Sequence, residues 1–265
     1  MGLEINLLWK LIIFTIIIHF IDTLSYSVRL NSVKSGKFAL SISLFNMIVL
    51  ISRTANMMQG PLIGLLMDKS IKMNYDPIMD IRQVILATTI GTCMGILFIP
   101  TFLKLFSKAV LKLEETGSIP SLVVQSLSVA NIKRITKSTI RPSKKMFIGL
   151  RFKNIPKRLL LLNTFITGVY TIGVLSAYYA SIYVPENRLA VSASSGMING
   201  IASILLTLFI DPKAALITDE AYRGKREYED VKALVIMLIG TKLLGTLLAQ
   251  LLFLPGAKFI AFFYK

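Results

Sequence analysis

The chain of 265 residues has little of the chemistry from which most enzyme sites are built. Cys93 is its only cysteine and His19 its only histidine, which excludes an internal disulfide, a thiolate metal site and any catalytic scheme that requires two histidines. It also lacks a GxxxxGK[ST] phosphate-binding loop and a nucleophile with a base at a recognisable spacing. The sequence therefore predicts no catalytic residue, no bound metal and no cofactor.

Acidic residues are scarce as well, since 14 Asp and Glu stand against 30 Lys and Arg and give a formal net charge of +16. In a soluble domain such an excess would suggest nucleic-acid binding. Hydrophobic residues, however, make up 54% of the chain and the mean hydropathy is +0.67, more than one soluble core of this length would use. We therefore expect a membrane protein that does not bind nucleic acid.

Long apolar stretches recur along the whole chain, and a transmembrane helix requires about 20 mainly apolar residues. The stretches that qualify are residues 5–26, 38–60, 83–106, 158–184, 189–210 and 231–254. The predicted fold is all-α, a polytopic membrane protein of about six transmembrane helices with a polar central cavity, in a single transmembrane domain over residues 1–265. Pro61 makes the second helix either long or broken, and Pro100 predicts a kink in the third.

Basic residues follow the first, third and fifth of these stretches, which places those loops in the cytoplasm and both termini outside. The segment 107–157 is the most basic and is predicted to be a cytoplasmic loop that attracts anionic membrane lipids. Within it, residues 119–140 mix apolar and basic side chains, a pattern that fits an interfacial helix or a solvated loop equally well.

Arg53 and Lys242 lie deep inside apolar stretches, where an unpaired charge costs several kcal/mol. From the predicted boundaries, Arg53 lies about 22 Å and Lys242 about 16 Å from the cytoplasmic surface, whereas Asp22 lies only about 6 Å from it. No acidic partner is therefore expected at their depth. Snorkelling to an interface is the alternative, and it suits Lys242 poorly because midspan is the longest way out. We predict that both cations face a cavity that receives an anion.

Other polar residues share helical faces with these charges. Thr15, His19, Asp22, Tyr26 and Arg29 fall on one face of the first helix, either as a polar seam in which Asp22 pairs with His19 or Arg29, or in a substrate or proton role. In the fifth stretch, Ser192, Gly196 and Gly200 form a row that predicts close helix packing. The candidate substrate-binding residues are Arg53, Lys242, Asn56, Asn199, Ser203, Asp22 and His19.

Residues 185–224, PENRLAVSASSGMINGIASILLTLFIDPKAALITDEAYRG, resemble the Amj family of alternate flippases for lipid II, above all in the run SGMING and the Asp211-Pro212 step. The resemblance extends over the layout of six spans. It implies that the substrate is lipid II, the undecaprenyl-pyrophosphate-linked precursor of peptidoglycan, moved from the inner to the outer leaflet of the bacterial cell membrane. It assigns no functional residues.

The charge pattern agrees with such a substrate, because a bare pyrophosphate cannot enter hydrocarbon without donors that replace its water. Arginine gives a phosphate two hydrogen bonds from its planar fork, and lysine acts as a point charge. Two alternatives stay open, an enzyme acting on a phospholipid headgroup through Asp22 and His19, and a permease for another anion. A channel or scaffold would instead tolerate loss of Arg53 and Lys242.

Overall fold

The computed structural model describes residues 2–118, 121, 140 and 149–265. These residues form helices and connecting turns without a β-strand, and six helical segments are long and apolar enough to cross a membrane, which confirms the predicted fold class. The continuous spans are α1 (Gly2–Ser35), α2 (Phe38–Met73), α3 (Ile78–Thr116), α6 (Lys157–Ala180) and α10 (Tyr228–Phe262). A short 3-10 turn, η2 (Phe152–Asn154), precedes α6.

The fifth span is not one regular helix. It runs over Pro185–Tyr222 in successive pieces, which are η3 (Pro185–Asn187), α7 (Arg188–Ala193), α8 (Ser195–Leu205), the π-helical turn η4 (Leu206–Ile210) and α9 (Asp211–Tyr222). Pro212 stands at the start of α9, where the missing proline N–H leaves no hydrogen bond of that helix unmade. The predicted span 189–210 therefore omitted α9, whose sequence is too polar to be recognised as membrane helix.

The first span is also longer than its apolar stretch, because α1 continues through polar residues to Ser35 and ends at Gly36, whose φ of 68° favours glycine. Polar contacts with other helices hold these last turns. Arg29 pairs with Asp211 of α9, and Asn31 bonds Ser41 of α2 and Ser107 of α3. Tertiary contacts, both these polar bonds and the burial of Val28 and Leu30, extend α1 by more than two turns.

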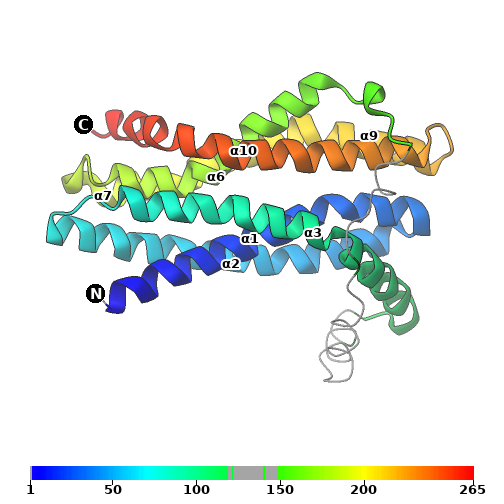
Figure 1. Cartoon of the computed structure of the whole chain (residues 1–265), viewed down its shortest axis with the longest axis horizontal. Coiled ribbons are helices and arrows are strands. Elements are labelled where there is room, and N and C mark those ends of the chain that lie inside the picture. The colour runs from blue at the N-terminus through cyan, green and yellow to red at the C-terminus, as the bar shows by residue number, and fades with distance from the viewer. Residues whose placement is uncertain (1, 119–120, 122–139, 141–148) are drawn as a thin grey trace.

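Prolines do not interrupt the second and third spans, since α2 continues through Pro61 and α3 through Pro100. The long alternative for the second span is therefore correct. Figure 1 shows that the C-terminal part of α3 runs in a different direction from its first part, as expected of a helix that contains a proline.

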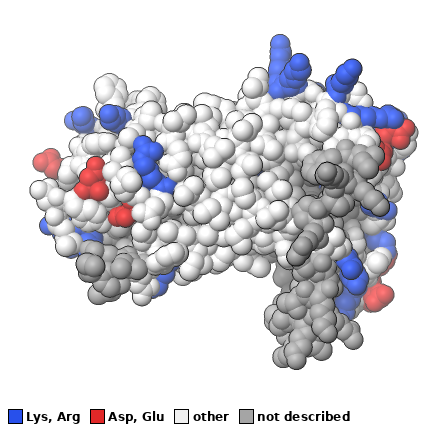
Figure 2. Space-filling model, in the orientation of Figure 1, with Lys and Arg blue, Asp and Glu red and all other residues white. Residues whose placement is uncertain are grey.

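The spans form two groups of three, α1–α3 and α6–α10 (Figure 1). α1 packs against α3 and α2, whereas α6 packs against α10 and α8, and contacts of α1 with α10 and α9 join the groups. α1 and α6 run in opposite directions, and both chain termini lie at one end of the bundle (Figure 1). We call this the terminal end and the opposite one, which carries Lys37, Lys225 and Arg226, the basic end. Figure 2 shows charged side chains gathered towards the two ends of the molecule.

Two hydrophobic cores hold the bundle. One lies towards the basic end and includes Val28, Phe106 and Leu234. The other lies towards the terminal end and joins α1, α2, α3, α6 and α10 through fully buried side chains such as Leu11, Ile63, Ile85, Tyr179 and Phe253. Burying a large side chain contributes about 1.5–3 kcal/mol in water, but inside a bilayer the gain comes from tight packing. The helices are therefore closely packed at the terminal end.

Helices approach most closely at glycines other than those predicted. A Cβ added to Gly245 of α10 would lie 2.7 Å from the Thr164 carbonyl oxygen of α6, and one added to Gly91 of α3 would lie 2.6 Å from the Ile16 carbonyl oxygen of α1. At Gly196 and Gly200 an added Cβ meets nothing within 4 Å. The prediction of close packing at these two glycines is wrong, because no neighbour within the described part of the chain packs against this face of α8.

The basic segment 107–157 begins inside α3, which continues to Thr116, and ends at the start of α6. Most of the predicted interfacial helix, residues 119–140, lies outside the described residues. Its structure, like the anionic-lipid contacts expected of it, stays a prediction.

Candidate functional site

A cavity of about 840 Å³ lies between the two groups of helices. α1 and α2 line it from the first group, and α6, α8, η4, α9 and α10 line it from the second, whereas none of the residues described in α3 contributes. Its lining includes Arg53, Lys242, Asn56, Ser203, Asp22 and His19. The structure thus brings together all the candidate residues except Asn199.

The three charges deep in this cavity share one depth. Counted from the helix ends at the basic side, Asp22 lies about 20 Å along α1, Arg53 about 22 Å along α2 and Lys242 about 21 Å along α10. The expectation that Asp22 lies at a different depth from both cations is wrong, because α1 continues beyond its apolar stretch to Ser35. An acidic group therefore stands at the level of both cations.

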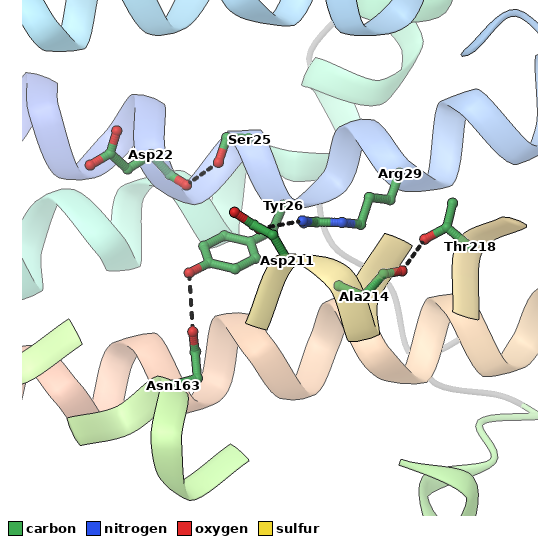
Figure 3. Close-up of polar contacts among 8 residues, drawn as sticks. All are labelled: Asp22, Ser25, Tyr26, Arg29, Asn163, Asp211, Ala214 and Thr218. Carbon is green, nitrogen blue, oxygen red and sulfur yellow. Dashed lines mark hydrogen bonds and ion pairs between the residues drawn. The ribbon is translucent and has the colours of Figure 1, made fainter. Parts of the chain in front are cut away.

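Lys242 is buried, with 4% of its surface exposed, so its stem does not carry the charge to an interface. Its Nζ lies 5.7 Å from the centre of the Tyr26 ring, within the range of a cation–π contact. Figure 3 shows the Tyr26 hydroxyl directed at Asn163, with 3.4 Å between Tyr26 Oη and the accepting Asn163 Oδ1. Asn163 Nδ2 donates to Thr241 Oγ1 and the Leu238 carbonyl, which anchors the contact to α10.

Arg53 projects from the face of α2 that lines the cavity and is exposed along it. Among the described residues, neither Arg53 nor Lys242 forms an ion pair with a carboxylate. Asp22 acts electrostatically on both Lys242 and Tyr170, and Arg53 acts on Tyr170 from α2. Asp22, Arg53 and Lys242 therefore influence one another across the cavity, and the two cations remain available to bind an anion.

The Asp22 carboxylate is held by a hydroxyl rather than by a cation. Ser52 Oγ donates to Asp22 Oδ1 at 2.9 Å and joins α1 to α2 beside Arg53. Neither predicted pairing of Asp22 forms among the described residues, since Arg29 pairs with Asp211 and His19 Nδ1 is buried without a hydrogen-bond partner. The remaining polar residue of this helical face, Thr15, accepts a hydrogen bond from Gln59 of α2.

The cavity reaches the basic end. Its lining extends from Phe38 and Thr218 near that end to Asn56, about 27 Å further along α2. Arg29 Nη2 and Asp211 Oδ1 lie 3.1 Å apart near its mouth and link α1 to α9 (Figure 3). The basic end is therefore the side from which the deep charges are reached.

The opposite end is closed by contacts between the two groups of helices. Tyr178 of α6 covers Gly60 and Gly64 of α2, since a Cβ added to Gly60 would lie 3.2 Å from the Tyr178 hydroxyl oxygen and one added to Gly64 would lie 3.3 Å from its ring. Arg188 pairs with Asp68 at 3.4 Å across the same interface. These contacts therefore separate the cavity from the terminal end of the bundle.

Asn199 faces α6 instead of the cavity. Its Oδ1 is buried without a hydrogen-bond partner, and a Cβ added to Gly173 would lie 2.3 Å from it. The candidate list omitted several lining residues, notably Thr167, Tyr170, Arg29 and Asp211, although Arg29 lies on the polar face predicted for the first helix. Asp211 lies just beyond the predicted fifth span, 189–210, and only its place one residue before a proline signals a position at the start of a helix.

Taken together, the helices and the cavity define a polytopic, multi-pass membrane protein with a polar cavity, whose lining carries two cations that form no ion pair with any described carboxylate. The family model described as Amj, alternate to MurJ, matches residues 14–264. The chain is also 39% identical over 254 residues to the lipid II flippase Amj of Bacillus subtilis (strain 168), covering 95% of this chain and 94% of that protein. The chain belongs to the Amj family. No solved structure matches it.

Proposed function

We propose that this protein is a flippase that moves lipid II from the inner to the outer leaflet of the cell membrane. The observation that carries the proposal is the pair of cations Arg53 and Lys242, which form no ion pair among the described residues and lie at one depth of a cavity that reaches the basic end. The flippase name of the Bacillus subtilis relative supports the same substrate.

The deep cations supply what a pyrophosphate loses when it leaves water. Arg53 offers a planar fork to two phosphate oxygens, and Lys242 adds a charge from the opposite wall. Asn56 and Ser203 provide neutral donors within the same lining. Since Asp22 stands at the same depth, it limits how tightly the anion is held and so favours its release.

The basic end faces the cytoplasm in this proposal, with both termini outside, because Lys and Arg of membrane proteins accumulate on the cytoplasmic side. The cavity then receives substrate from the inner leaflet, and anionic lipids gather at the basic loop. An inside-negative potential favours outward movement of each negative charge by about 2.3 kcal/mol per 100 mV. Release outside requires the contacts of Tyr178 with Gly60 and Gly64 to open.

A headgroup enzyme is the competing function. It would need His19 and Asp22 as an acid–base pair, yet the hydrogen bond to the Asp22 carboxylate comes from Ser52, and His19 Nδ1 has no partner among the described residues. This geometry favours transport over catalysis.

The test uses cells in which this protein is the only flippase and measures lipid II on the outer leaflet. Arg53→Ala and Lys242→Ala are expected to abolish its appearance while the protein stays folded in the membrane. Lys104→Ala is the matched control, because Lys104 is an exposed cation in α3 outside the cavity lining. Wild-type export by either cavity variant would overturn the proposed role of the cations.

A further inference from the structure

The middle of α2 stands apart from the second group of helices. Near the basic end, the ring of Phe38 meets Tyr222 of α9 edge-on, with 4.9 Å between ring centroids. Near the terminal end, Gly60 and Gly64 meet Tyr178 of α6. Between these two contacts α2 packs mainly against α1, and within the described chain it has no extensive packing against α8 or η4.

One face of this middle part of α2 is apolar towards the basic end and polar further along the helix. Phe38, Ile42, Phe45 and Val49 follow one another at steps of four, three and four residues and line the cavity. The same face then continues with polar residues, ending at Arg53 and Asn56. An apolar row therefore leads from the basic end directly to the deep cations.

The facing wall carries a second apolar row. Ala202 of α8, Leu206 of η4 and Ile210 at its end recur every four residues and line the same cavity. Ser203 and Thr207 lie beside this row and supply hydroxyls to the cavity. Two apolar rows thus flank a gap that no extensive helix contact closes among the described residues.

We infer that the groove between α2 and α8–η4 holds the polyprenyl chain of the substrate while its pyrophosphate reaches Arg53 and Lys242. This inference rests on the proposed function and adds the path of the lipid tail to it. Exposure of a hydrocarbon chain to a wet cavity is unfavourable for every methylene, so a lipid whose headgroup enters the bundle requires an apolar exit for its tail. We assign this exit to the groove because its apolar rows lead directly to Arg53 and Lys242.

The order of residues along the groove also fits a lipid of the inner leaflet. The apolar rows lie between the basic end and the depth of Arg53, and with the basic end facing the cytoplasm, as proposed above, this stretch adjoins the inner leaflet. The tail therefore stays in the bilayer at the level of that leaflet while the headgroup occupies the cavity. Only the charged part of the substrate leaves its original environment.

The test replaces Phe45, in the groove, with photo-crosslinking benzoylphenylalanine, in full-length protein reconstituted into phosphatidylglycerol vesicles with trace radiolabelled lipid II. Ile51 is the matched control, because it lies on the opposite face of α2 and is 59% exposed. A third variant carries the crosslinker at Asn56, beside the cations. Mass spectrometry of each adduct identifies the tail or the headgroup as the attached part.

We expect tail adducts at Phe45 that excess unlabelled lipid II suppresses, headgroup adducts at Asn56, and only background labelling at Ile51. Headgroup adducts at Asn56 without tail adducts at Phe45 would overturn the groove and leave the flippase function standing. Equal labelling at Phe45 and Ile51 would mean that bulk lipid fills the gap, which also overturns the groove. Absence of labelling at all three positions would contradict both the groove and lipid II as substrate.

Discussion

The Lys242 ammonium lies 5.7 Å from the centre of the Tyr26 ring, so an aromatic face stands where a buried lysine would usually meet a carboxylate. Such contacts contribute about 0.5–2 kcal/mol, less than the cost of a charge at mid-bilayer depth. The contact therefore orients the ammonium but does not offset the full cost of burying its charge. Binding of an anion near this incompletely stabilised ammonium is therefore favourable, which is the behaviour expected of a substrate site.

Replacing this lysine is expected to separate stability from function. Lys242→Met removes the uncompensated charge at similar length and is predicted to leave the unfolding free energy unchanged or to raise it by up to about 3 kcal/mol, while lipid II export is lost. Unfolding in mixed detergent micelles and outer-leaflet lipid II measure the two effects. A strongly destabilised Lys242→Met protein would mean that the ammonium has a structural partner.

Loss of the cavity carboxylate is expected to tighten anion binding. Asp22→Asn keeps an oxygen for the Ser52 hydroxyl but removes a negative charge that acts on Lys242. We expect the affinity for undecaprenyl pyrophosphate in lipid nanodiscs to rise about tenfold, or about 1.4 kcal/mol. Asp68→Asn, at the terminal end, is the control. Weaker binding by the Asp22 variant would show that the carboxylate contacts the substrate directly.

The ion pair at the cavity mouth is expected to contribute little to stability. Arg29 and Asp211 side chains are 25% and 47% exposed, and pairs this open are worth less than about 1 kcal/mol. A double-mutant cycle with Arg29→Gln and Asp211→Asn, followed by thermal unfolding, measures the coupling. A coupling above about 2 kcal/mol would identify the pair as a structural clamp between α1 and α9.

Glycines of the two kinds described above are expected to respond oppositely to alanine. Gly245→Ala places a methyl 2.7 Å from a backbone carbonyl of α6 and should destabilise the protein by about 1–3 kcal/mol. Gly200→Ala meets nothing within 4 Å and should stabilise α8 by about 0.5–1 kcal/mol, through helix propensity. Thermal unfolding of both variants checks the contrast. Destabilisation by Gly200→Ala would indicate that this face of α8 is covered in the membrane, as by a second protein.

Apolar length was enough to predict the spans, because a membrane helix must present about 20 apolar residues to lipid. It was not enough for their ends. α1 continues past its apolar stretch through Arg29 and Asn31, and α9 is a polar extension of the fifth span. Both extensions depend on partners from other helices, which no local pattern contains.

The cavity residues illustrate the same limit. The cost of a buried charge singled out Arg53 and Lys242, and helical spacing placed His19, Asp22 and Tyr26 on one face. The depth of Asp22 was wrong because it was counted from a helix end that lies further along the chain. Asn199 had the right chemistry and the right span, yet its side chain turns to Gly173, a rotation that only the packing of α8 on α6 fixes.

The π-helical turn at Leu206–Ile210 holds one residue more than an α-helical turn would. Removing that residue, or passing it to a neighbouring turn, rotates the helix on one side relative to the other by about 100°. Asp211, which follows the turn directly, would then swing away from Arg29. The fifth span therefore contains a turn at which a shift of register inside one helix would separate Asp211 from Arg29 without tilting any other span.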